Sequence, residues 1–404
     1  MDLLYEPSST SAIAISEQLR TTLQQLEAVA ESGRTTSAGI ERVLFVSAGA
    51  GLAIARSLKR YTDEIGRNLR YEAYASATFV NLMHVNAQTV NDTTTLVVLS
   101  SKSGMTPETV EAAALLKDKA CKSVVFTASA NSKLASFGHQ TFCTGKTTQA
   151  FQAIHMLMLS FIGGILNARE HWALLPALVS SLQALPAALF KAAEKGVQPG
   201  IAFAARFAED HPLYFIASGC AGIVSHAFGL CILQERFGLE IHTVDGADFF
   251  HSFVETVRPD KRSHYVLVIP DDASRPQMLD VKTFFENQFK EGEISFQVIK
   301  TEGLDISGID PRIGKVVGPM ICEAFLKPWA TALAEATGKT MQDPLLHMGK
   351  FDYYNCHQPN GPVSRLGNLS GQPFSITSLS SGAEGAVTVG QTLTPELRVL
   401  GKPR

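Results

Sequence analysis

Short apolar runs alternate with amphipathic segments along most of this chain. Six runs are rich in β-branched side chains and are followed by small or turn-forming residues: 43–47, 95–100, 123–129, 213–218, 265–270 and 294–299. Apolar runs of this length are typical of parallel strands that are covered on both faces. The segments between them, such as 107–118, have the periodicity of helices. The alternation predicts an α/β protein with doubly wound parallel sheets and helices on both faces.

The chain also repeats its own pattern at an offset of 170 residues. Three separated blocks keep this register without a gap: Phe45 aligns with Phe215, Gly49 with Gly219, Ala77 with Ala247, Phe79 with Phe249, and 96–99 with 266–269. A fixed offset over separated blocks indicates a duplicated structural unit. We therefore predict two tandem domains of the same fold.

The pattern divides the chain into six segments. They are an N-terminal helical segment (1–40, with an amphipathic helix at 12–31), a first domain (41–170), a helical linker (171–208), a second domain (209–325), a C-terminal helix with an active-site segment (326–354), and a flexible tail (355–404). The tail is rich in Gly, Pro, Ser and Thr and has few large apolar residues, a composition that seldom forms a packed core.

Composition favours a cytoplasmic protein. The 404 residues are 45% hydrophobic and carry a net charge of −3, so a nucleic-acid partner is not expected. None of the six cysteines forms a C-x-x-C pair, which favours reduced thiols. The first ten residues lack the basic and apolar regions of a signal peptide. The longest apolar run, 153–166, is too short to span a bilayer, so we predict a buried helix there and no membrane association.

A candidate phosphate-binding loop follows the apolar run 95–100. Its residues Ser101, Lys102, Ser103 and Thr106 place three hydroxyls and an ammonium group before a predicted helix. The unpaired N–H groups at a helix start and nearby hydroxyls can bind a phosphate together, and Gly104 lets the backbone approach it. The alternative interpretation is an ordinary helix N-cap made by the same hydroxyls.

Glu235 and His251 are the candidate acid–base pair. Glu235 lies in the mostly apolar helical segment 231–238, where partial burial would raise its pKa into the range of a general base. An imidazole such as that of His251 exchanges protons near neutral pH. The alternatives are a helix-end glutamate paired with Arg236 and a structural histidine.

The loop pattern S-x-S-G-x-T and the spacing of sixteen residues between Glu235 and His251 resemble those of the SIS (sugar isomerase) domain family. The resemblance covers roughly 40–354 and is nearest to ketosamine-6-phosphate deglycases, with a further likeness to the isomerase half of glucosamine-6-phosphate synthase. It implies that Ser101, Ser103 and Thr106 hold the substrate phosphate, with Lys102 beside it. It also implies that Glu235 is the base at C1 or C2 of the sugar and that His251 is the acid for ring opening or the leaving group.

The same resemblance suggests further substrate contacts at Gly49, Gly51, Ser218 and Lys350. The chain departs from the family pattern at five places; among them, Ser252-Phe253 stands where Gly-Pro is usual, and the paired arginines near the C-terminus are absent. Gly51 stands where a serine is usual, the segment 147–149 reads Thr-Thr-Gln without the usual lysine, and Ile232 replaces the lysine of the glucosamine-6-phosphate synthase isomerase half.

The resemblance implies a deglycase that hydrolyses a 6-phosphorylated ketosamine to an aldose 6-phosphate and an amine. The alternatives are an aldose–ketose or amino-sugar phosphate isomerase, and a non-catalytic regulator that binds a sugar phosphate. The resemblance also implies that this chain forms a homodimer with two shared active sites, in which His251 is supplied by the partner.

We expect no cofactor. The glycine pair at 49 and 51 is followed by Ile54 where a dinucleotide fingerprint needs its third glycine. We also expect no metal site, because His242, Asp245, Asp248 and His251 lack a recognised ligand spacing.

Overall fold

The structure, a computed structural model, describes residues 11–206, 211–339, 343 and 345–347. Both repeats belong to one compact unit, Met1–Arg365. The candidate residue Lys350, the rest of the predicted segment 348–354 and the predicted tail 355–404 lie outside the described residues.

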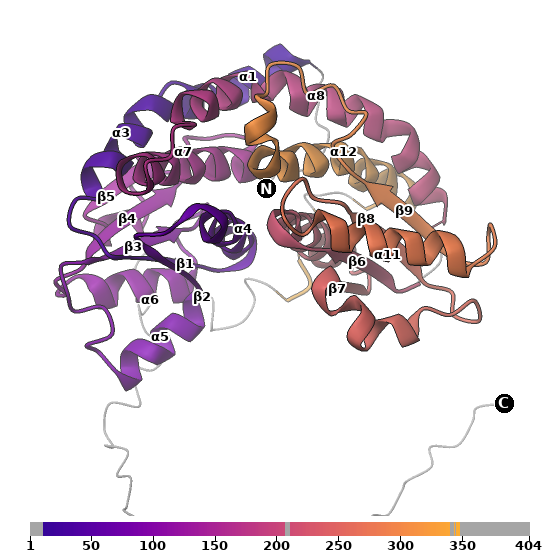
Figure 1. The fold of residues 1–404 in the computed structure, drawn as a ribbon, viewed down its shortest axis with the longest axis horizontal. Coiled ribbons are helices and arrows are strands. Elements are labelled where there is room, and N and C mark those ends of the chain that lie inside the picture. Colours follow the sequence, from indigo (N-terminus) through magenta and orange to yellow (C-terminus); the bar gives the residue numbers. More distant parts are fainter. Residues whose placement is uncertain (1–10, 207–210, 340–342, 344, 348–404) are drawn as a thin grey trace, which may run out of the picture. The chain divides into compact units, whose positions relative to one another are not determined.

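Each repeat contains one parallel β-sheet (Figure 1), and this confirms the predicted fold class. Sheet 1 has the order β2-β1-β3-β4-β5, with β1 at Arg42–Ser47, β2 at Arg70–Ala75, β3 at Thr95–Ser100, β4 at Lys122–Thr127 and β5 at Gln140–Cys143. Sheet 2 has the order β7-β6-β8-β9, with β6 at Leu213–Ala217, β7 at Ile241–Asp245, β8 at His264–Val268 and β9 at Ser295–Ile299. The six apolar runs correspond to β1, β3, β4, β6, β8 and β9.

The offset of 170 residues is confirmed in three dimensions. It carries β1 onto β6, β2 onto β7 and β3 onto β8, and each set has the same spatial order. Gly49 and Gly219, which the offset pairs, both follow the central strand with positive φ angles, 53° and 58°. This conformation favours glycine, so the two glycines mark the same turn in both repeats.

The sequence pattern did not predict β2, β5 and β7. These three are edge strands, and most of their residues are partly or fully exposed. An edge strand buries fewer side chains, so it does not need a continuous apolar run; β9, the remaining edge strand, was predicted because 294–299 is nonetheless such a run.

The helices of the first half are α4 (Gly49–Ile65), α5 (Ser76–Val85), α6 (Pro107–Leu116), the short 3₁₀ helix η2 (Ala135–Phe137) and α7 (Ala150–Glu170). The single helix predicted at 12–31 is wrong in detail. The segment forms three pieces, α1 (Ala12–Gln18), α2 (Arg20–Leu23) and α3 (Leu26–Thr36). At the second break, the Gln25 side chain donates to the carbonyl oxygens of Thr21 and Cys143.

The second half begins after the long helix α8 (Leu175–Arg206). A continuous helical run follows β6 and changes type along its length: η3 (Gly219–Ala221), α9 (Gly222–Val224), the π-helix η4 (Ser225–Gln234) and α10 (Glu235–Phe237). The remaining helices are η5 (Gly246–His251), η6 (Phe253–Thr256), α11 (Arg275–Gln288), η7 (Pro311–Ile313) and α12 (Gly314–Thr337).

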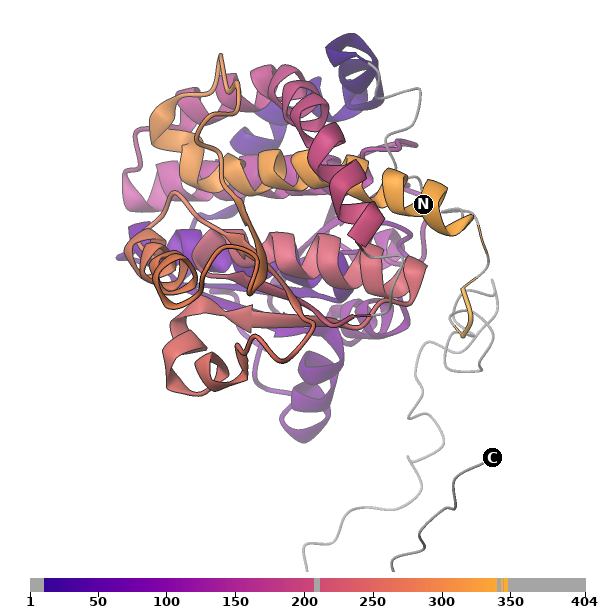
Figure 2. The same ribbon diagram turned by 90° about the vertical axis from the view of Figure 1, so that its right-hand side faces the viewer.

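One hydrophobic core joins the two repeats. Side chains from one face of each sheet, including Phe45 and Phe215, pack with residues of α7, α8 and α12. Separate clusters on the opposite faces pack against α5 and α6 in the first repeat and α11 in the second. Helices α8 and α12 lie side by side in both views (Figures 1 and 2), and Gly196 permits this, since a Cβ there would lie 1.8 Å from the carbonyl oxygen of Phe325.

Helices α7 and α8 are long and apolar enough to cross a membrane, judged by length and composition alone. Their apolar windows are 94% and 44% buried inside the protein, and every residue of Ala150–Leu166 in α7 is buried. Core helices of soluble proteins have the same composition. We therefore interpret α7 as a buried core helix, as predicted for 153–166, whereas α8 buries part of its surface against α12.

Candidate active site

The three hydroxyls of the predicted phosphate loop converge. The Ser101 hydroxyl lies 2.8 Å from that of Thr106 and 3.5 Å from that of Ser103. Thr106 is the N-cap residue of α6, yet its side chain makes no capping hydrogen bond. The simple N-cap interpretation therefore does not account for the Thr106 hydroxyl, which faces Ser101 instead of the helix amides. Ser103 is exposed and Ser101 is 7% exposed, so a ligand can reach the outer part of the group.

The loop is fixed against the segment that follows β4. Gly104 has φ of 61°, and a Cβ there would lie 2.2 Å from the Ser132 hydroxyl. The Lys102 carbonyl accepts hydrogen bonds from the Ala128 N–H at 3.0 Å and the Thr127 hydroxyl at 3.3 Å. The loop therefore has a defined shape before any ligand binds.

Gly51 lies where β1, β3 and the start of α4 meet. A Cβ at this position would lie 2.2 Å from the Ser47 hydroxyl and 2.9 Å from the Ser100 hydroxyl. These two hydroxyls are 2.9 Å apart. The space that a serine side chain at 51 would need is therefore occupied by Ser47 and Ser100, which gives a physical reason for this departure from the family pattern.

Helix α4 and the helical run 219–237 occupy equivalent positions in the two repeats. They pack against each other and run antiparallel. In the middle of α4, the Ser57 hydroxyl donates to the carbonyl of Cys220, at the start of the second run. At the beginning of α4, the backbone of Ala50 hydrogen-bonds the Cys231 thiol, near the end of that run. Glu235 follows Cys231 by about one helical turn. The antiparallel pairing therefore places Glu235, one turn after Cys231, toward the start of α4.

Glu235 has the environment predicted for a general base. Its side chain is 23% exposed, and burial raises its pKa above the ordinary value, an effect that nearby Arg236 partly opposes. The closest approach of Arg236 Nε to Glu235 Oε1 is 3.7 Å. This is longer than the 2.7–2.9 Å or so of a charge-assisted hydrogen bond. Pairing with Arg236 therefore does not neutralise the carboxylate fully.

A π-helix places Glu235. Residues Ser225–Gln234 form this wide helix, and the Glu235 N–H donates to the carbonyl of Leu230, five residues earlier. Stretches of π-helix are rare and are frequent at functional sites, because the added residue per turn changes the direction of the side chains that follow. Sequence reasoning missed this feature, since its residues have ordinary helical composition.

His251 lies at the other end of β7 from Glu235. The helical run that carries Glu235 ends before β7 begins, whereas η5, which ends at His251, starts immediately after β7. The five residues of β7 span about 13 Å at 3.3 Å per step. His251 is exposed, and among the described residues no hydrogen bond joins it to Glu235. Within one chain, the two predicted catalytic residues therefore lie at opposite ends of β7.

Three phenylalanines lie close to His251 in the sequence, and they differ in their exposure to solvent. Phe249 is fully buried in the core of the second repeat, Phe253 is partly buried, and Phe250 is 46% exposed. The Phe250 ring packs edge-on against Phe249 and Phe284. Phe250 therefore leaves an exposed aromatic surface directly beside His251.

In the second repeat, a carboxylate occupies the position equivalent to the phosphate loop. The offset pairs Lys102 with Asp272 and Ala50 with Cys220. The Asp272 carboxylate accepts the Cys220 N–H at 2.6 Å and the Ser274 N–H at 2.9 Å, and it is 8% exposed. Ser218, predicted to contact substrate, is also engaged here, since its hydroxyl donates to Asp245 at 2.5 Å.

Replacement of Asp272 by Ala is expected to lower the free energy of unfolding by about 1.5–3 kcal/mol, because a buried N–H loses a charged acceptor. Denaturant unfolding measures this, with exposed Asp248→Ala as the control. Equal losses in the two variants would show that Asp272 has no such structural role.

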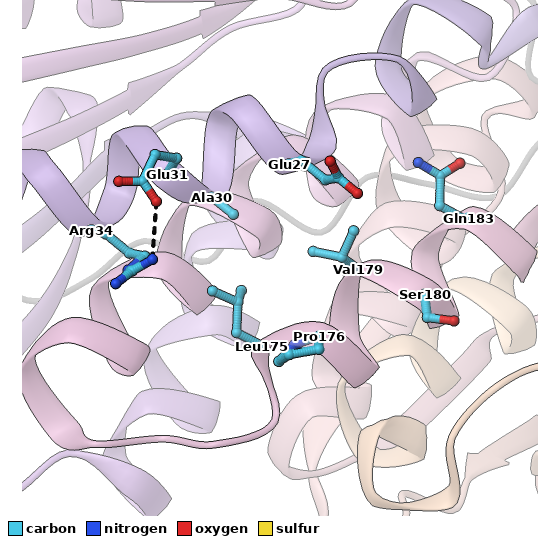
Figure 3. A pocket seen from close by; sticks show the side chains of 9 residues that line it. All are labelled: Glu27, Ala30, Glu31, Arg34, Leu175, Pro176, Val179, Ser180 and Gln183. Atoms are coloured by element: carbon cyan, nitrogen blue, oxygen red, sulfur yellow. Dashed lines mark hydrogen bonds and ion pairs between the residues drawn. The ribbon is translucent and has the colours of Figure 1, made fainter.

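The described residues hold no group of three or more His, Cys, Asp or Glu side chains arranged for a metal ion. His242 was one of the four residues considered as metal ligands in the sequence analysis. Its ring nitrogen hydrogen-bonds Glu240 at 2.8 Å, and its ring stacks on Tyr214. A hollow of about 400 Å³ lies between α3 and α8 (Figure 3). Its lining contains none of the predicted site residues, so it is separate from the candidate active site.

Comparisons with known proteins show the family and the fold of the chain. The SIS domain model matches residues 38–162. A protein of Rhizobium rhizogenes named agropine synthesis conjugase is 86% identical over 357 residues, which are 88% of this chain and 99% of that protein. The fructosamine deglycase of Bacillus subtilis is 24% identical over 350 residues, 85% of this chain and all of that protein. A crystal structure of a proposed phosphosugar isomerase from Bacillus subtilis has the same fold, with a TM-score of 0.72, 22% identity, and coverage of 83% and 99% of the two chains.

Proposed function

This chain belongs to the SIS domain family, and we propose that it is a soluble cytoplasmic enzyme that interconverts a 6-phosphorylated ketosamine with an aldose 6-phosphate and an amine. The two related proteins carry names for the opposite directions of such a reaction, since a conjugase joins and a deglycase separates. The conjugase is far more similar in sequence. The name of that relative therefore favours synthesis as the main direction in this chain, with the predicted deglycase activity as its reverse.

The proposed synthesis has two stages. The amine adds to C1 of the open aldose and water leaves, which gives a Schiff base. Glu235 then removes the proton at C2, and the electron pair moves to form an enolamine. A proton returned to C1 gives the ketosamine, and the carboxylate is regenerated. In the deglycase direction Glu235 takes the proton from C1, and water finally releases the amine.

The observation that carries this proposal is the antiparallel packing of α4 on the helical run 219–237. It brings a partly buried carboxylate with a raised pKa, that of Glu235, to the start of α4. The same turn at Gly51 contacts Ser100, at the beginning of the predicted phosphate loop. Glu235 of the second repeat and the predicted anion-binding loop of the first therefore both lie toward the start of α4, which supports a shared site for proton transfer on a sugar phosphate.

The second repeat supports the position of the phosphate. There, an internal carboxylate binds the Cys220 N–H, which the repeat pairs with the Ala50 N–H. In the first repeat no acidic residue stands at the equivalent loop position, because Lys102 replaces Asp272. The thiol of Cys231, whose pKa is raised to about 12 mainly by burial, is neutral near Ala50. A ligand oxygen that displaces this neutral thiol from Ala50 would therefore take the place that Asp272 fills in the second repeat.

The test uses purified protein in both directions. In one arm, glucose 6-phosphate and a primary amine are followed by mass spectrometry for the ketosamine phosphate. In the other, fructosamine 6-phosphates are followed for amine release. We expect turnover in both arms. Aldose–ketose interconversion without any amine dependence would support the isomerase alternative, and binding without turnover would support the regulator.

Replacement of Ser103 by Ala is expected to weaken binding of the phosphorylated sugar by about 1–2 kcal/mol, because one hydrogen bond to a charged group is lost. Calorimetric titration with glucose 6-phosphate and with glucose measures the effect, and exposed Ser307→Ala is the control. Equal affinity of the unmodified protein for both sugars would refute the phosphate loop.

A further inference from the structure

A buried polar cluster joins α7 of the first repeat to α12 of the second. Glu323 and Lys327 on α12 are 1% and 4% exposed, and their charged groups are 3.9 Å apart. The Lys327 ammonium donates to the side-chain oxygen of Gln149, and the Gln152 side-chain amide donates to the Glu323 carboxylate. All four side chains are nearly inaccessible to solvent.

Stability alone does not explain this cluster. Burial raises the pKa of Glu323 and lowers that of Lys327, so desolvation disfavours the charged form of both groups. Replacement of a buried ion pair by apolar residues is often neutral or stabilising. A pair that costs free energy to bury calls for a second role, and its contacts show where to look.

The contacts lead to the phosphate loop. Gln149 is the N-cap residue of α7 and ends the segment 144–149, which follows β5. At the other end of that segment, the Thr144 N–H donates to the carbonyl of Thr127 at 3.0 Å. The Thr127 hydroxyl in turn donates to the carbonyl of Lys102 in the loop. A short series of hydrogen bonds and backbone therefore connects Lys327 with Lys102.

We propose that Lys327 and Glu323 are positioning residues, which hold the segment 144–149 and, through Thr127, keep the phosphate loop in its binding geometry. This inference rests on the proposed function, because it assigns the loop to a substrate phosphate. The inference adds that the affinity of the phosphate loop for its ligand depends on the charged pair Glu323 and Lys327 on α12.

The first test removes the charges in pairs. Lys327→Met alone leaves Glu323 buried and unpaired, so the variant that carries both Lys327→Met and Glu323→Gln is the one to measure. Calorimetry with glucose 6-phosphate and with glucose should show that the double variant loses about tenfold in affinity for the phosphorylated sugar. Its affinity for glucose should stay unchanged. A general loss of packing would affect both ligands alike.

The second test moves the ammonium group instead of removing it. In Lys327→Gln combined with Gln149→Lys, the two partners exchange places, and the ammonium lies again beside Glu323. We expect this variant to recover the preference for the phosphorylated sugar. Lys191→Met, which removes an exposed ion pair with Asp305, is the control for loss of a lysine elsewhere.

The outcomes separate this inference from the proposed function. If the unmodified protein does not distinguish glucose 6-phosphate from glucose, the proposed phosphate site is wrong. If it distinguishes them and the folded double variant does so equally well, only the positioning role is refuted. Failure of the exchanged pair to restore the preference, in a protein that unfolds like the unmodified one, refutes it too.

Discussion

Replacement of Glu235 by Gln is expected to slow turnover by about 10²–10⁴-fold, the usual cost of a lost general base. The amide keeps the size and shape of the side chain but cannot accept the proton from C1 or C2. Steady-state rates with the ketosamine phosphate measure the effect, and KM should change little. Glu240→Gln, at an exposed glutamate on the same segment, is the matched control. Full turnover by Glu235→Gln would remove Glu235 from the mechanism.

The pH dependence gives an independent check on the same residue. Because burial raises the pKa of Glu235, the reactive carboxylate forms only above the ordinary range of a glutamate. The acidic limb of kcat/KM should therefore lie at a pH above the ordinary glutamate value and should be absent from the residual activity of Glu235→Gln.

Glu235→Gln, which should lower activity, is expected to raise the stability of the fold at neutral pH. A raised pKa in the folded state means that protonated Glu235 stabilises the fold, and that this contribution is present below the ordinary pKa. It is lost as the pH rises through the raised pKa. At neutral pH Glu235→Gln should thus unfold at a higher denaturant concentration than the unmodified protein, and the difference should vanish in acid. A lower midpoint at neutral pH would contradict the assigned burial.

Two inactive variants, Glu235→Gln and His251→Ala, are expected to recover activity when their subunits exchange. Within one chain the two residues flank opposite ends of β7, so a shared site needs His251 from a partner subunit. The exposed ring of Phe250 beside His251 suits such an interface, because aromatic residues are enriched there. In a mixed homodimer one of the two sites would have both residues, so a fully exchanged equal mixture should reach about a quarter of the unmodified activity.

Controls make this mixing experiment decisive. Native mass spectrometry must show that subunits exchange. A mixture of Glu235→Gln with the variant that carries both substitutions contains no complete site and should stay inactive. If exchange is complete and the first mixture also stays inactive, the two residues do not meet across an interface. A monomer in solution would exclude the shared site directly.

The sequence determined the architecture, because the signals for it are local. Each central strand is buried on both faces and therefore reads as an apolar run, and the duplicated register at 170 residues predicted two copies of one sheet. The three hydroxyls of 101–106 were also visible, since all of them lie within six consecutive residues. The edge strand β2 could not be recognised in the sequence, because its partly exposed residues do not form a continuous apolar run.

Contacts between distant segments were decided only by the tertiary structure. No property of the sequence shows that Cys231 meets Ala50, that Asp272 fills the anion position of the second repeat, or that Lys327 reaches Gln149 from 178 residues away. The sequence suggested that the usual lysine of the 147–149 segment is missing, and the fold supplies an ammonium group at that place from α12. Local pattern predicts which face of an element is buried, whereas packing of the two repeats selects the side chains that meet between them.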